Sequence, residues 1–456
     1  MQHNSDPSEA SEFLEMHPEV RVIELLIPDL NGILRGKRIE RSTLPKVYRD
    51  GLCLPRSRFG ADITGDTAES TGLGFASGDM DQLCWPVAGS LKRVPWQDKP
   101  MAQLLMTMHE LNGTPYFADP QQVLRAALQR FTELGLRPQV AVELEFYLID
   151  HERTVSGKPQ PPVSPVTGER EGSTQVYGMN ELDDFRALFD DIARAAEIQA
   201  LPAETAVAEY APGQYEVNLA YQADVVAACH HAILLKRMIK AITQRHGLEA
   251  TFMAKPYSEF SGSGTHIHIS MLDESDNNIF SGDSEIGSEQ LQYAIGGLLA
   301  CMGESMAIFA PNANSYRRFQ AETFAPVSPT WGWNNRTVAV RIPTGSAQAR
   351  RLEHRVAGAD ANPYLLVATL LAAIHHGMSR KLDPGEPITG NAYEQVPASL
   401  PCHWHSALDA FTNRSILANY LDPRFCKVYL ASKHEERHQF ERHVSALEHQ
   451  WYLRMV

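Results

Sequence analysis

The stretch Val140-Ala-Val-Glu143-Leu-Glu145-Phe-Tyr-Leu-Ile149 decides the fold, because it combines the pattern of a buried strand with two acidic side chains. Residues i and i+2 of a β-strand point to the same face, so Glu143 and Glu145 lie side by side. The apolar residues around them predict that the strand is otherwise largely buried. A buried carboxylate stays charged only when a cation or a hydrogen-bond donor compensates it. The sequence therefore predicts metal ions, arginine side chains or both beside these carboxylates.

Three further segments carry side chains of the same kind. His266-Ile-His268 and Arg351-Leu-Glu353-His-Arg355 repeat the alternating spacing, and taken singly each is more often polar surface or ion-paired strand. Glu209 and Glu216 flank the tight turn Ala211-Pro-Gly213. Together the acidic and imidazole groups suit two hard metal ions. The candidate metal ligands are Glu143, Glu145, Glu209, Glu216, His266 and Glu353.

Arginine is dense among these candidate ligands. Its planar guanidinium binds carboxylate and phosphate groups and stays charged at any relevant pH. Metal ions combined with arginines are what phosphoryl transfer requires. Neither a Walker A sequence nor a GxGxxG segment opening a helix occurs, so the common nucleotide-binding loops are absent from the sequence. The arginines are Arg317, Arg318, Arg336, Arg341, Arg350, Arg351 and Arg355.

The composition favours an ordinary cytoplasmic enzyme over several other classes of protein. A net charge of −14 over 456 residues argues against a nucleic-acid partner. The six cysteines are far apart without a CxxC pair, which suits buried thiols in a reducing compartment. The longest apolar runs, Leu365–Ile374 and Ile295–Met302, are shorter than the roughly 20 residues of a membrane span. We expect core helices there and no membrane partner.

The order of sequence segments predicts a flexible N-terminal tail over residues 1–17 and a domain boundary near residue 117. Strands are expected at 21–27 and 33–39, joined by a turn containing Asn31-Gly32, and at 103–110. Asp119-Pro120 predicts the start of a helix over 121–134. Further helices are expected at 183–199, 223–246, 288–310, 362–378 and 435–453.

The last of these predicted helices carries an apolar stripe of Phe440, Val444, Leu447 and Trp451. Such a stripe is typical of a helix that packs against something. The sequence leaves two alternatives open, which are docking on a neighbouring molecule and packing on the core of the same chain.

The order and the amino-acid sequences of the polar segments resemble those of glutamine synthetases from about residue 20 to the C-terminus. The resemblance implies an α+β fold with a small β-grasp domain (18–117) and a large catalytic α/β domain (118–456) containing a curved antiparallel sheet. It also implies a ring-forming homo-oligomer, a dodecamer, with active sites between neighbours. The segments that carry it are Glu143-Leu-Glu145, Glu209–Glu216, Ala254-Lys-Pro256, Gly262–Ser270, Asn314–Arg318, Asn335-Arg-Thr337, Val340–Pro343, Arg351–Arg355 and Ala361–Tyr364.

The resemblance also implies a role for each residue. Glu145, Glu209 and Glu216 would hold the metal ion nearer the amino acid, and Glu143, His266 and Glu353 the one nearer the nucleotide. Arg318, Arg355 and Gly262 would bind glutamate, and Arg336 would stabilise the transferring phosphoryl group. The positions that match nucleotide contacts are Glu204, His268, Ser270, Arg341 and Arg351.

The implied chemistry uses ATP and Mg²⁺, with Mn²⁺ as a plausible substitute. ATP phosphorylates the γ-carboxylate of glutamate, a nitrogen nucleophile attacks the acyl phosphate, and phosphate leaves. Water must be excluded, because it would hydrolyse the acyl phosphate.

The sequence departs from the family pattern in three places, two of which concern the nitrogen nucleophile and one of which concerns glutamate. Ammonia-using members carry a flap glutamate just before an Ala-Pro, where this chain has Phe324, and Glu322 is the nearby alternative. The family's Asp-Gly-Ser-Ser loop is replaced by Phe59–Asp66. Ser261 stands where the family has an asparagine that contacts glutamate.

The sequence around Asp62 and the Asn314–Gln320 segment look like glutamate–putrescine ligases, which make γ-glutamyl-polyamines for polyamine catabolism. An aromatic ring at Phe324 suits an alkyl chain better than ammonium. Asp62, Asp66 and Glu69 are candidates for the far charge of a diamine, although each also suits a loop cap. The sequence thus predicts an ATP-dependent γ-glutamyl amine ligase. The alternatives are a glutamine synthetase using ammonia and a catalytically silent relative.

Overall fold

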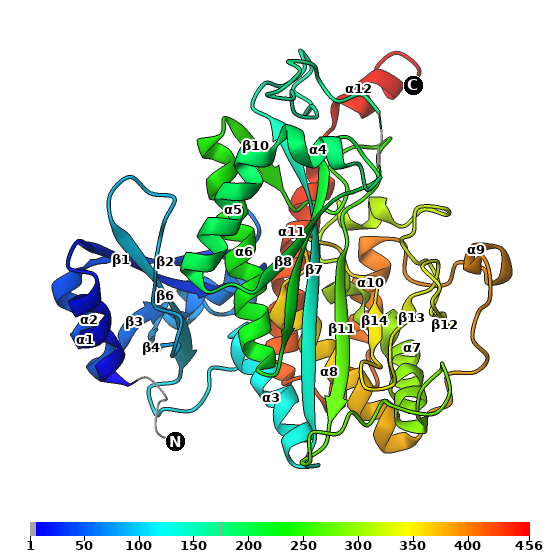
Figure 1. The fold of residues 1–456 in the computed structure, drawn as a ribbon, viewed down its shortest axis with the longest axis horizontal. Coiled ribbons are helices and arrows are strands. Elements are labelled where there is room, and N and C mark those ends of the chain that lie inside the picture. The colour runs from blue at the N-terminus through cyan, green and yellow to red at the C-terminus, as the bar shows by residue number, and fades with distance from the viewer. Residues whose placement is uncertain (1–5, 174–175) are drawn as a thin grey trace.

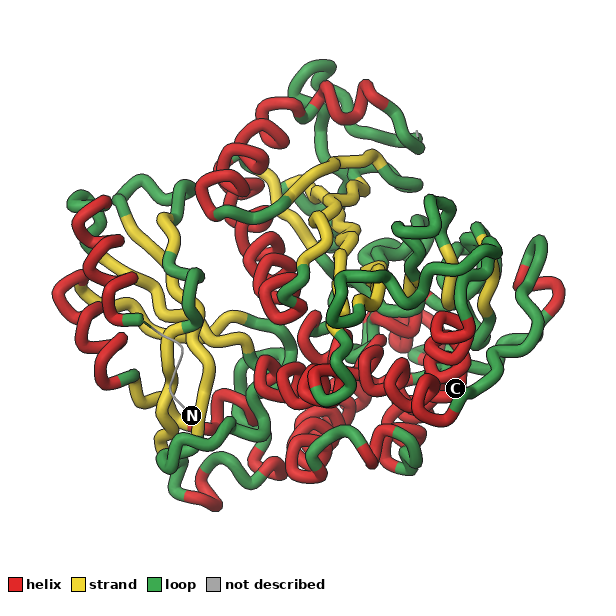
Figure 2. The backbone as a smooth tube through the Cα atoms, turned by 60° about the horizontal axis from the view of Figure 1, so that its bottom comes forward, coloured by secondary structure: helices red, strands yellow, loops and turns green. Residues whose placement is uncertain are grey.

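The computed structural model describes residues 6–173 and 176–456, which form two β-sheets with their own helices (Figures 1 and 2). The smaller sheet belongs to the N-terminal part and stands to one side of the larger body (Figure 1). The α+β fold class predicted from the sequence is confirmed. We propose that the domain boundary lies near residue 117, in the connection between the last strand of the smaller sheet and the helix that follows.

The N-terminal sheet has the order β2-β1-β6-β4-β3, with β5 beside β6. β1 and β6 are parallel and the remaining pairs are antiparallel. The predicted turn joins β1 to β2, and Gly32 there has a φ of +72° that glycine adopts readily. Helices α1 (Pro7–Met16) and α2 (Leu44–Asp50) pack on this unit. The strands are β1 (Val22–Pro28), β2 (Leu34–Glu40), β3 (Leu52–Pro55), β4 (Asp81–Pro86), β5 (Lys92–Arg93) and β6 (Met101–His109).

The prediction of a flexible tail over residues 1–17 is wrong for the part that the structure describes. Residues 7–16 form α1, in which Asp6 accepts a hydrogen bond from the Ser8 amide and Pro7 occupies the first helical position. Ala10 and Phe13, three residues apart on one helix face, are buried. Their burial holds the helix on the domain. Residues 1–5 of the predicted tail lie outside the described residues.

The larger sheet has the order β12-β13-β14-β11-β7-β9-β8, with β10 beside β7. Its pairs are antiparallel except for β12 with β13. Two of its strands occupy the centre of the body in Figure 1, where long β7 runs beside β11. The strands are β7 (Arg137–Asp150), β8 (Ala203–Ala208), β9 (Gln214–Gln222), β10 (Leu248–Thr251), β11 (Thr265–Leu272), β12 (Trp331–Trp333), β13 (Val340–Ile342) and β14 (Leu352–His354).

Strand β7 is largely buried apart from its two acidic side chains, as predicted, and it alternates between a buried and a more open face over residues 138–145. Val140, Val142 and Leu144 are buried toward the core, whereas Glu143 and Glu145 are only partly buried. The same alternation continues in β11, where Ile267 and Ile269 face the core. One face of the sheet is therefore apolar and the other carries the polar side chains.

Helices pack against the larger sheet and against one another. α6 contacts β7, β9 and β10, α3 contacts β7, and α8 contacts α3, α6 and α7. The predicted helices at 121–134, 183–199, 223–246, 288–310 and 362–378 are confirmed within a few residues. The helices are α3 (Pro120–Thr132), α4 (Met179–Asp184), α5 (Arg186–Gln199), α6 (Val225–Arg245), α7 (Glu289–Phe309), α8 (Pro363–Arg380), α9 (Ala392–Gln395), α10 (Trp404–Thr412), α11 (Pro423–Arg442) and α12 (Ala446–Tyr452).

Among the described residues, α7 is the one helix long and apolar enough to cross a membrane by length and composition. Two thirds of its apolar window (67%) is buried inside the protein, where it packs on α8 and α10. This burial is that of a core helix, as predicted for the apolar run within it.

The C-terminal region forms two helices rather than the single helix predicted over 435–453. The chain leaves α11 after Arg442, and Ser445 begins α12 with a capping box to Glu448. Phe440, Val444 and Trp451 are all more than half exposed. The alternative that this apolar stripe packs on the core of its own chain is therefore wrong, and docking on a neighbour stays a prediction.

Asn362 links the two sheets and offers a test of this architecture. Its side chain caps α8 at the Tyr364 amide (3.0 Å) and donates hydrogen bonds to the backbone oxygens of Asp29 (3.0 Å) and Leu30 (3.2 Å). We expect Asn362→Ala to lower the free energy of unfolding by about 2–3 kcal/mol, because a cap is lost and two buried carbonyl groups lose a donor. Denaturant titration measures the change.

Asn391→Ala is the matched control, because Asn391 caps the short helix α9 through the Tyr393 amide (3.1 Å). A loss of about 1 kcal/mol or less is expected there. Equal losses in the two variants would show that Asn362 does not join the two parts of the fold.

Candidate active site

The strand register gathers the predicted metal ligands on the open face of the larger sheet. Glu143 on β7 lies opposite His266 on β11, and Glu145 lies opposite Glu216 on β9. On the other side of β11, His268 pairs with Glu353 on β14. Residues directly opposite in antiparallel strands share a face, so the polar side chains of four strands meet.

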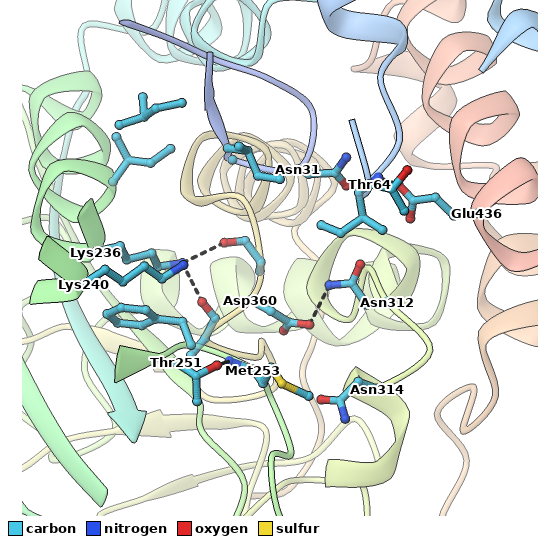
Figure 3. A pocket seen from close by; sticks show the side chains of 18 of the residues that line it. Asn31, Thr64, Lys236, Lys240, Thr251, Met253, Asn312, Asn314, Asp360 and Glu436 are labelled. Carbon is cyan, nitrogen blue, oxygen red and sulfur yellow. Dashed lines mark hydrogen bonds between the residues drawn. The ribbon is translucent and has the colours of Figure 1, made fainter. Parts of the chain in front are cut away.

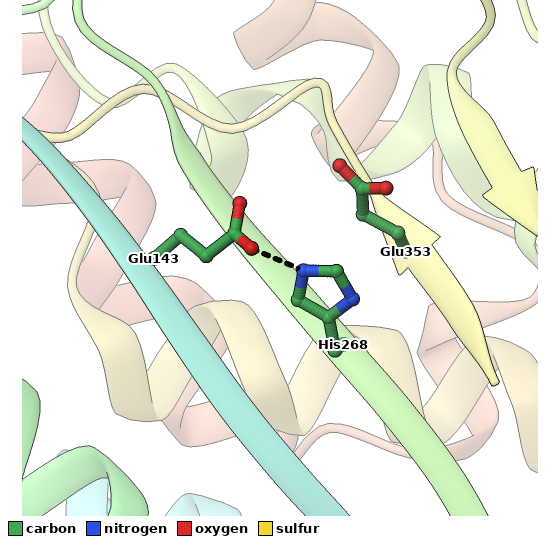
Figure 4. Close-up of side chains that lie close together, drawn as sticks. All are labelled: Glu143, His268 and Glu353. Carbon is green, nitrogen blue, oxygen red and sulfur yellow. Dashed lines mark hydrogen bonds and ion pairs between the residues drawn. The ribbon is translucent and has the colours of Figure 1, made fainter. Parts of the chain in front are cut away.

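The distances confirm that the polar side chains converge (Figure 4). The Glu143 carboxylate lies 2.8 Å from His268 Nε2 and 3.1 Å from His266 Nδ1. His266 Nδ1 is 4.0 Å from carboxylate oxygens of both Glu216 and Glu353, and its Nε2 is 3.8 Å from Glu145. Five of the six predicted ligands thus lie within one cluster.

Glu209, the sixth predicted ligand, follows the last residue of β8. Its backbone N–H donates to the Gln214 oxygen (2.8 Å), which closes the predicted turn toward β9. Burial, the Glu145 carboxylate and the Glu143 carboxylate raise the pKa of Glu209 to about 8, and Arg336 opposes this rise. Glu209 therefore belongs electrostatically to the same cluster.

Two arginines neutralise Glu353, which is almost fully buried. Arg341 Nη1 donates to its carboxylate at 2.8 Å, and Arg355 donates to the other oxygen. Burial raises the pKa of Glu353, but Arg355, the two histidines and Arg341 outweigh it and lower the pKa to about 2. The Glu353 carboxylate is consequently ionised even when no metal ion is bound.

His268 is held between a donor and an acceptor. Arg351 Nε donates to its Nδ1 (3.2 Å), so the ring proton lies on Nε2 and is donated to Glu143. Burial raises the pKa of Glu143, yet the hydrogen bonds from His266 and His268 lower it overall. This chain of contacts positions Glu143 from the arginine side of the site.

Around Glu209 and Glu216 the carboxylates of the cluster outnumber the positively charged groups. Burial and the carboxylates of Glu143, Glu145 and Glu209 raise the pKa of Glu216 to about 9. Both Glu209 and Glu216 therefore keep protons near neutral pH when no cation is bound. A divalent cation is the group that would replace those protons.

The donor set fits divalent cations. Carboxylate oxygens predominate and imidazole completes the set, as Mg²⁺ and Mn²⁺ accept. Two groups have ligand atoms within 4.8 Å of one another: Glu143, His266 and Glu216, and Glu143, His268 and Glu353. The two groups share Glu143, and the second contains His268 where the resemblance implies His266. The first combines Glu143 and His266 of one predicted ligand set with Glu216 of the other.

The Arg318 side chain is buried beside the cluster. Its Nη1 donates to the Val356 oxygen (2.7 Å) and its Nη2 to the Arg355 oxygen (3.3 Å). A Cβ added at Gly262 would lie 2.7 Å from Arg318 Cγ, and one added at Gly264 would lie 2.7 Å from Arg318 Nη2. Both glycines are therefore needed for the close approach of this guanidinium. Burial lowers the pKa of Arg318, and the nearby Glu145 carboxylate opposes this effect.

Three further positions that the resemblance assigns to nucleotide or phosphate contacts lie on two strands of the larger sheet and on one loop. Ser270 follows His266 and His268 on the same face of β11, and its Oγ is 3.5 Å from Gln139. Glu204 is exposed on the edge strand β8. Arg336 is exposed in the loop between β12 and β13, from which its charge acts on Glu209.

The flap segment places Phe324 against Tyr210, a residue that sequence reasoning missed. The two rings lie 5.6 Å apart at 36°, and Phe324 keeps 39% of its surface exposed. Tyr210 directly follows Glu209, and that adjacency was the available signal. The backbone of Phe324 and of Glu322 is left-handed, with φ of +54° and +63°.

Asp62 is a loop cap within its own chain, which is the alternative that the sequence left open. It is fully buried, and its Oδ1 accepts hydrogen bonds from Thr64 (2.9 Å), Gly65 (3.0 Å) and Asp66 (3.1 Å) amides. The adjacent Ile63 amide donates to Glu436 on α11 (2.8 Å). Its other oxygen, Oδ2, is buried without a hydrogen-bond partner among the described residues, so burial within its own loop is what separates this carboxylate from a substrate ammonium. Asp66 and Glu69 are exposed.

Comparison with known proteins identifies relatives over nearly the whole chain. The family model described as glutamine synthetase, catalytic domain, matches residues 117–452. The γ-glutamylputrescine synthetase PuuA of Escherichia coli (strain K12) is 43% identical, with 98% of this chain and 94% of the relative covered. A glutamate–isopropylamine ligase from Pseudomonas sp is 35% identical, with 85% of this chain and 84% of the relative covered.

The same comparison reaches more distant sequences and solved structures. The γ-glutamylethanolamide synthetase GlnA4 of Streptomyces coelicolor is 32% identical, with 87% of this chain and 85% of the relative covered. The solved structure of apo GmaS without ligand has a TM-score of 0.84 at 27% identity and covers 98% of this chain and 99% of its own.

The raised pKa values make metal binding dependent on pH. We expect the affinity for Mg²⁺ to increase as the pH rises through the pKa values of Glu209 (about 8) and Glu216 (about 9), because the ion displaces their protons. Calorimetric titration in two buffers of different ionisation enthalpy measures the protons released.

Glu216→Gln should bind Mg²⁺ more weakly and release fewer protons. Glu197→Gln is the matched control, since that carboxylate is exposed on α5 and belongs to neither ligand group, and it should leave proton release unchanged. Proton release that is equal in all three proteins would contradict the charge imbalance at Glu209 and Glu216.

Proposed function

The chain belongs to the glutamine synthetase family, and from this premise we propose that it is an ATP-dependent ligase joining the γ-carboxylate of glutamate to an amine. Three relatives support amine ligation, because their names specify putrescine, isopropylamine and ethanolamide products or substrates. We assign putrescine or a longer polyamine as the amine, in polyamine catabolism, on the strength of the 43% identical relative.

Members of this family use ATP and divalent metal ions, and we propose Mg²⁺, with Mn²⁺ as a substitute. The residues that would hold two such ions are the carboxylates and imidazole of the cluster. Bound ions would supply charge neutralisation for the phosphate oxygens of ATP. The ligands proposed are Glu143, Glu145, Glu209, Glu216, His266 and Glu353.

Arg318 and Arg355 are the residues proposed to hold glutamate. Within the described residues, Arg318 donates only to backbone oxygens. It is buried near the Glu145 carboxylate and the Arg355 guanidinium, so a substrate carboxylate would stabilise the two guanidinium groups. Gly262 contributes by leaving room for the Arg318 side chain. Fixing the amino acid in this way orients its γ-carboxylate toward the phosphates.

The reaction then proceeds in two displacements. A γ-carboxylate oxygen of glutamate attacks the γ-phosphorus of ATP, and the bond to ADP breaks, which gives γ-glutamyl phosphate. The unprotonated amine nitrogen attacks the acyl carbon, the C–O bond to phosphate breaks, and the nitrogen loses a proton. Arg336 is proposed to stabilise the transferring phosphoryl group, and the proposed nucleotide contacts are Glu204, His268, Ser270, Arg341 and Arg351.

The observation that carries the choice of an amine over ammonia is the aromatic pair of Phe324 and Tyr210. A ring at the flap position provides an apolar wall for methylene groups, whereas it cannot accept the proton that an ammonium ion must lose before its nitrogen attacks. The pair lies next to Glu209, at the amino-acid side of the cluster. Glu322 is exposed and two residues from Phe324, which makes it a weaker substitute for a flap carboxylate.

The remaining partners are proposed from the family pattern. We propose a ring-forming homo-oligomer, a dodecamer, in which the Phe59–Asp66 loop reaches a neighbouring subunit's site. Asp66 and Glu69 then remain candidates for the far ammonium of a diamine, since Asp62 caps its own loop. A cytoplasmic location without nucleic-acid or membrane partners accords with the net charge of −14 and with the burial of α7.

A direct comparison of nucleophiles tests the proposed function. With glutamate and ATP, phosphate release with putrescine should have a kcat/KM at least about tenfold above that with ammonium. Only the diamine has methylene groups that can pack against the apolar wall. Phosphate release and mass spectrometry of the product measure both rates. Equal or faster turnover with ammonium would identify a glutamine synthetase, and no turnover with any amine would indicate a catalytically silent relative.

Changing the flap residue tests the aromatic wall. Phe324→Glu should raise the ammonium-to-putrescine ratio of kcat/KM by about tenfold, since a carboxylate binds ammonium and removes the apolar surface. Phe324→Leu, which keeps an apolar side chain, should retain the preference for putrescine. A ratio that is unchanged in Phe324→Glu would remove Phe324 from the specificity argument.

A further inference from the structure

A cavity of about 880 Å³ lies between the N-terminal sheet and helices α6 and α11 (Figure 3). The β1–β2 turn at Asn31–Leu34 forms one wall, and α6 and the segment Thr251–Met253 form another. Small-molecule sites commonly have about 300–1,000 Å³, so the cavity has the size of a ligand site. None of the residues assigned to metal, ATP, glutamate or amine above lines it.

Two lysines from successive turns of α6 point into this cavity (Figure 3). Lys236 Nζ donates to the backbone oxygens of Ala359 (2.5 Å) and Ala361 (3.3 Å). The Lys240 ammonium has no hydrogen bond or ion pair within the part of the chain that the structure describes, and it lies 5.7 Å from the centre of the Phe252 ring. Two ammonium groups thus face one partly open cavity.

The positive charge of these lysines is poorly compensated. Burial and the neighbouring Lys240 ammonium lower the pKa of Lys236 to about 7, and burial also lowers the pKa of Lys240. Asp360 is the acidic group in the lining that acts on Lys236, which it compensates in part. Its Oδ2 accepts hydrogen bonds from Asn312 (2.9 Å) and Ser315 (2.6 Å), and its Oδ1 is buried without a partner among the described residues. An anion in the cavity would stabilise both ammonium groups.

The other charged residues of the lining are already paired. Arg237 donates to Glu24, which also pairs with Arg38. Glu436 accepts hydrogen bonds from Lys433 (2.8 Å) and the Ile63 amide (2.8 Å). Lys240 is consequently the cationic group that remains available to a ligand.

Much of the remaining lining is apolar. Side chains from five different segments contribute to it, so a ligand with a hydrocarbon body would lose water-exposed surface on binding. A polyamine would meet like charges at Lys236 and Lys240, which distinguishes this cavity from the proposed amine site. The main apolar residues are Ile33, Ile233, Phe252, Met253, Trp404 and Phe440.

We propose that this cavity is a second ligand site, which binds a small organic anion. A carboxylate or phosphate group would contact the Lys240 and Lys236 ammonium groups, and the apolar body would pack on the surrounding hydrophobic side chains. The site does not depend on the proposed catalytic function, because it shares no residue with the metal cluster.

Calorimetric titration of the full chain in the absence of substrates tests the site. The probes are 4-phenylbutanoate, 2-phenylethyl phosphate and the uncharged 4-phenylbutanamide. At least one of the two anions should saturate at one site per chain, with an affinity at least about tenfold above that of the amide. The anion that binds more tightly decides between a carboxylate and a phosphate ligand.

Variants link the binding to the cavity. Lys240→Met should weaken the bound anion by at least about tenfold, and Lys240→Gln serves as a second variant if the first does not fold. Lys427→Met, on an exposed lysine of α11, should bind as the unaltered protein does. Absence of saturable binding, equal binding of the amide, or unchanged affinity in both Lys240 variants would overturn the proposal.

Discussion

Negative charge concentrated on one face of the larger sheet is the constraint on which the site depends. Strand alternation leaves the carboxylates no other direction, because the opposite face of β7, β9 and β11 is apolar and packed against helices. Arginine and histidine neutralise Glu353 and Glu143, whereas Glu209 and Glu216 retain protons. The charges of Glu353 and Glu143 are therefore compensated by the protein itself, whereas Glu209 and Glu216 would be ionised only when a cation binds.

Small residues and loops complete what the strands begin. Gly262 and Gly264 leave the space in which Arg318 lies beside Glu145, and Gly264 also donates its amide to the Glu145 carboxylate (2.7 Å). The flap carrying Phe324 belongs to neither sheet, yet it meets the chain immediately after Glu209. Rigid strands thus fix the charged groups, while a loop forms the wall proposed for the amine.

Local patterns predicted the strands, because a period of two fixes which side chains of one strand share a face. The convergence of Glu143, Glu145, Glu216, His266 and Glu353 was instead expected from the metal-ligand chemistry of these side chains and from the family resemblance. What depends on distant partners could not be read locally. Helix α1 is stable because its two apolar residues find a buried place on the N-terminal unit. The half-open face of β7 and the contact of Tyr210 with Phe324 likewise arise only when separate segments pack. Asp62 suited both a ligand and a cap, and only its hydrogen bonds decide between them.

The left-handed backbone of the flap bears on how this enzyme could diversify. A bulky residue at φ +54° occupies a conformation that costs roughly 1 kcal/mol or more, so the ring is retained there against local preference. Exchanging that single side chain leaves every strand of the phosphoryl-transfer machinery untouched. The wall proposed for the amine can therefore be altered at one position while the strands that carry the carboxylates stay as they are.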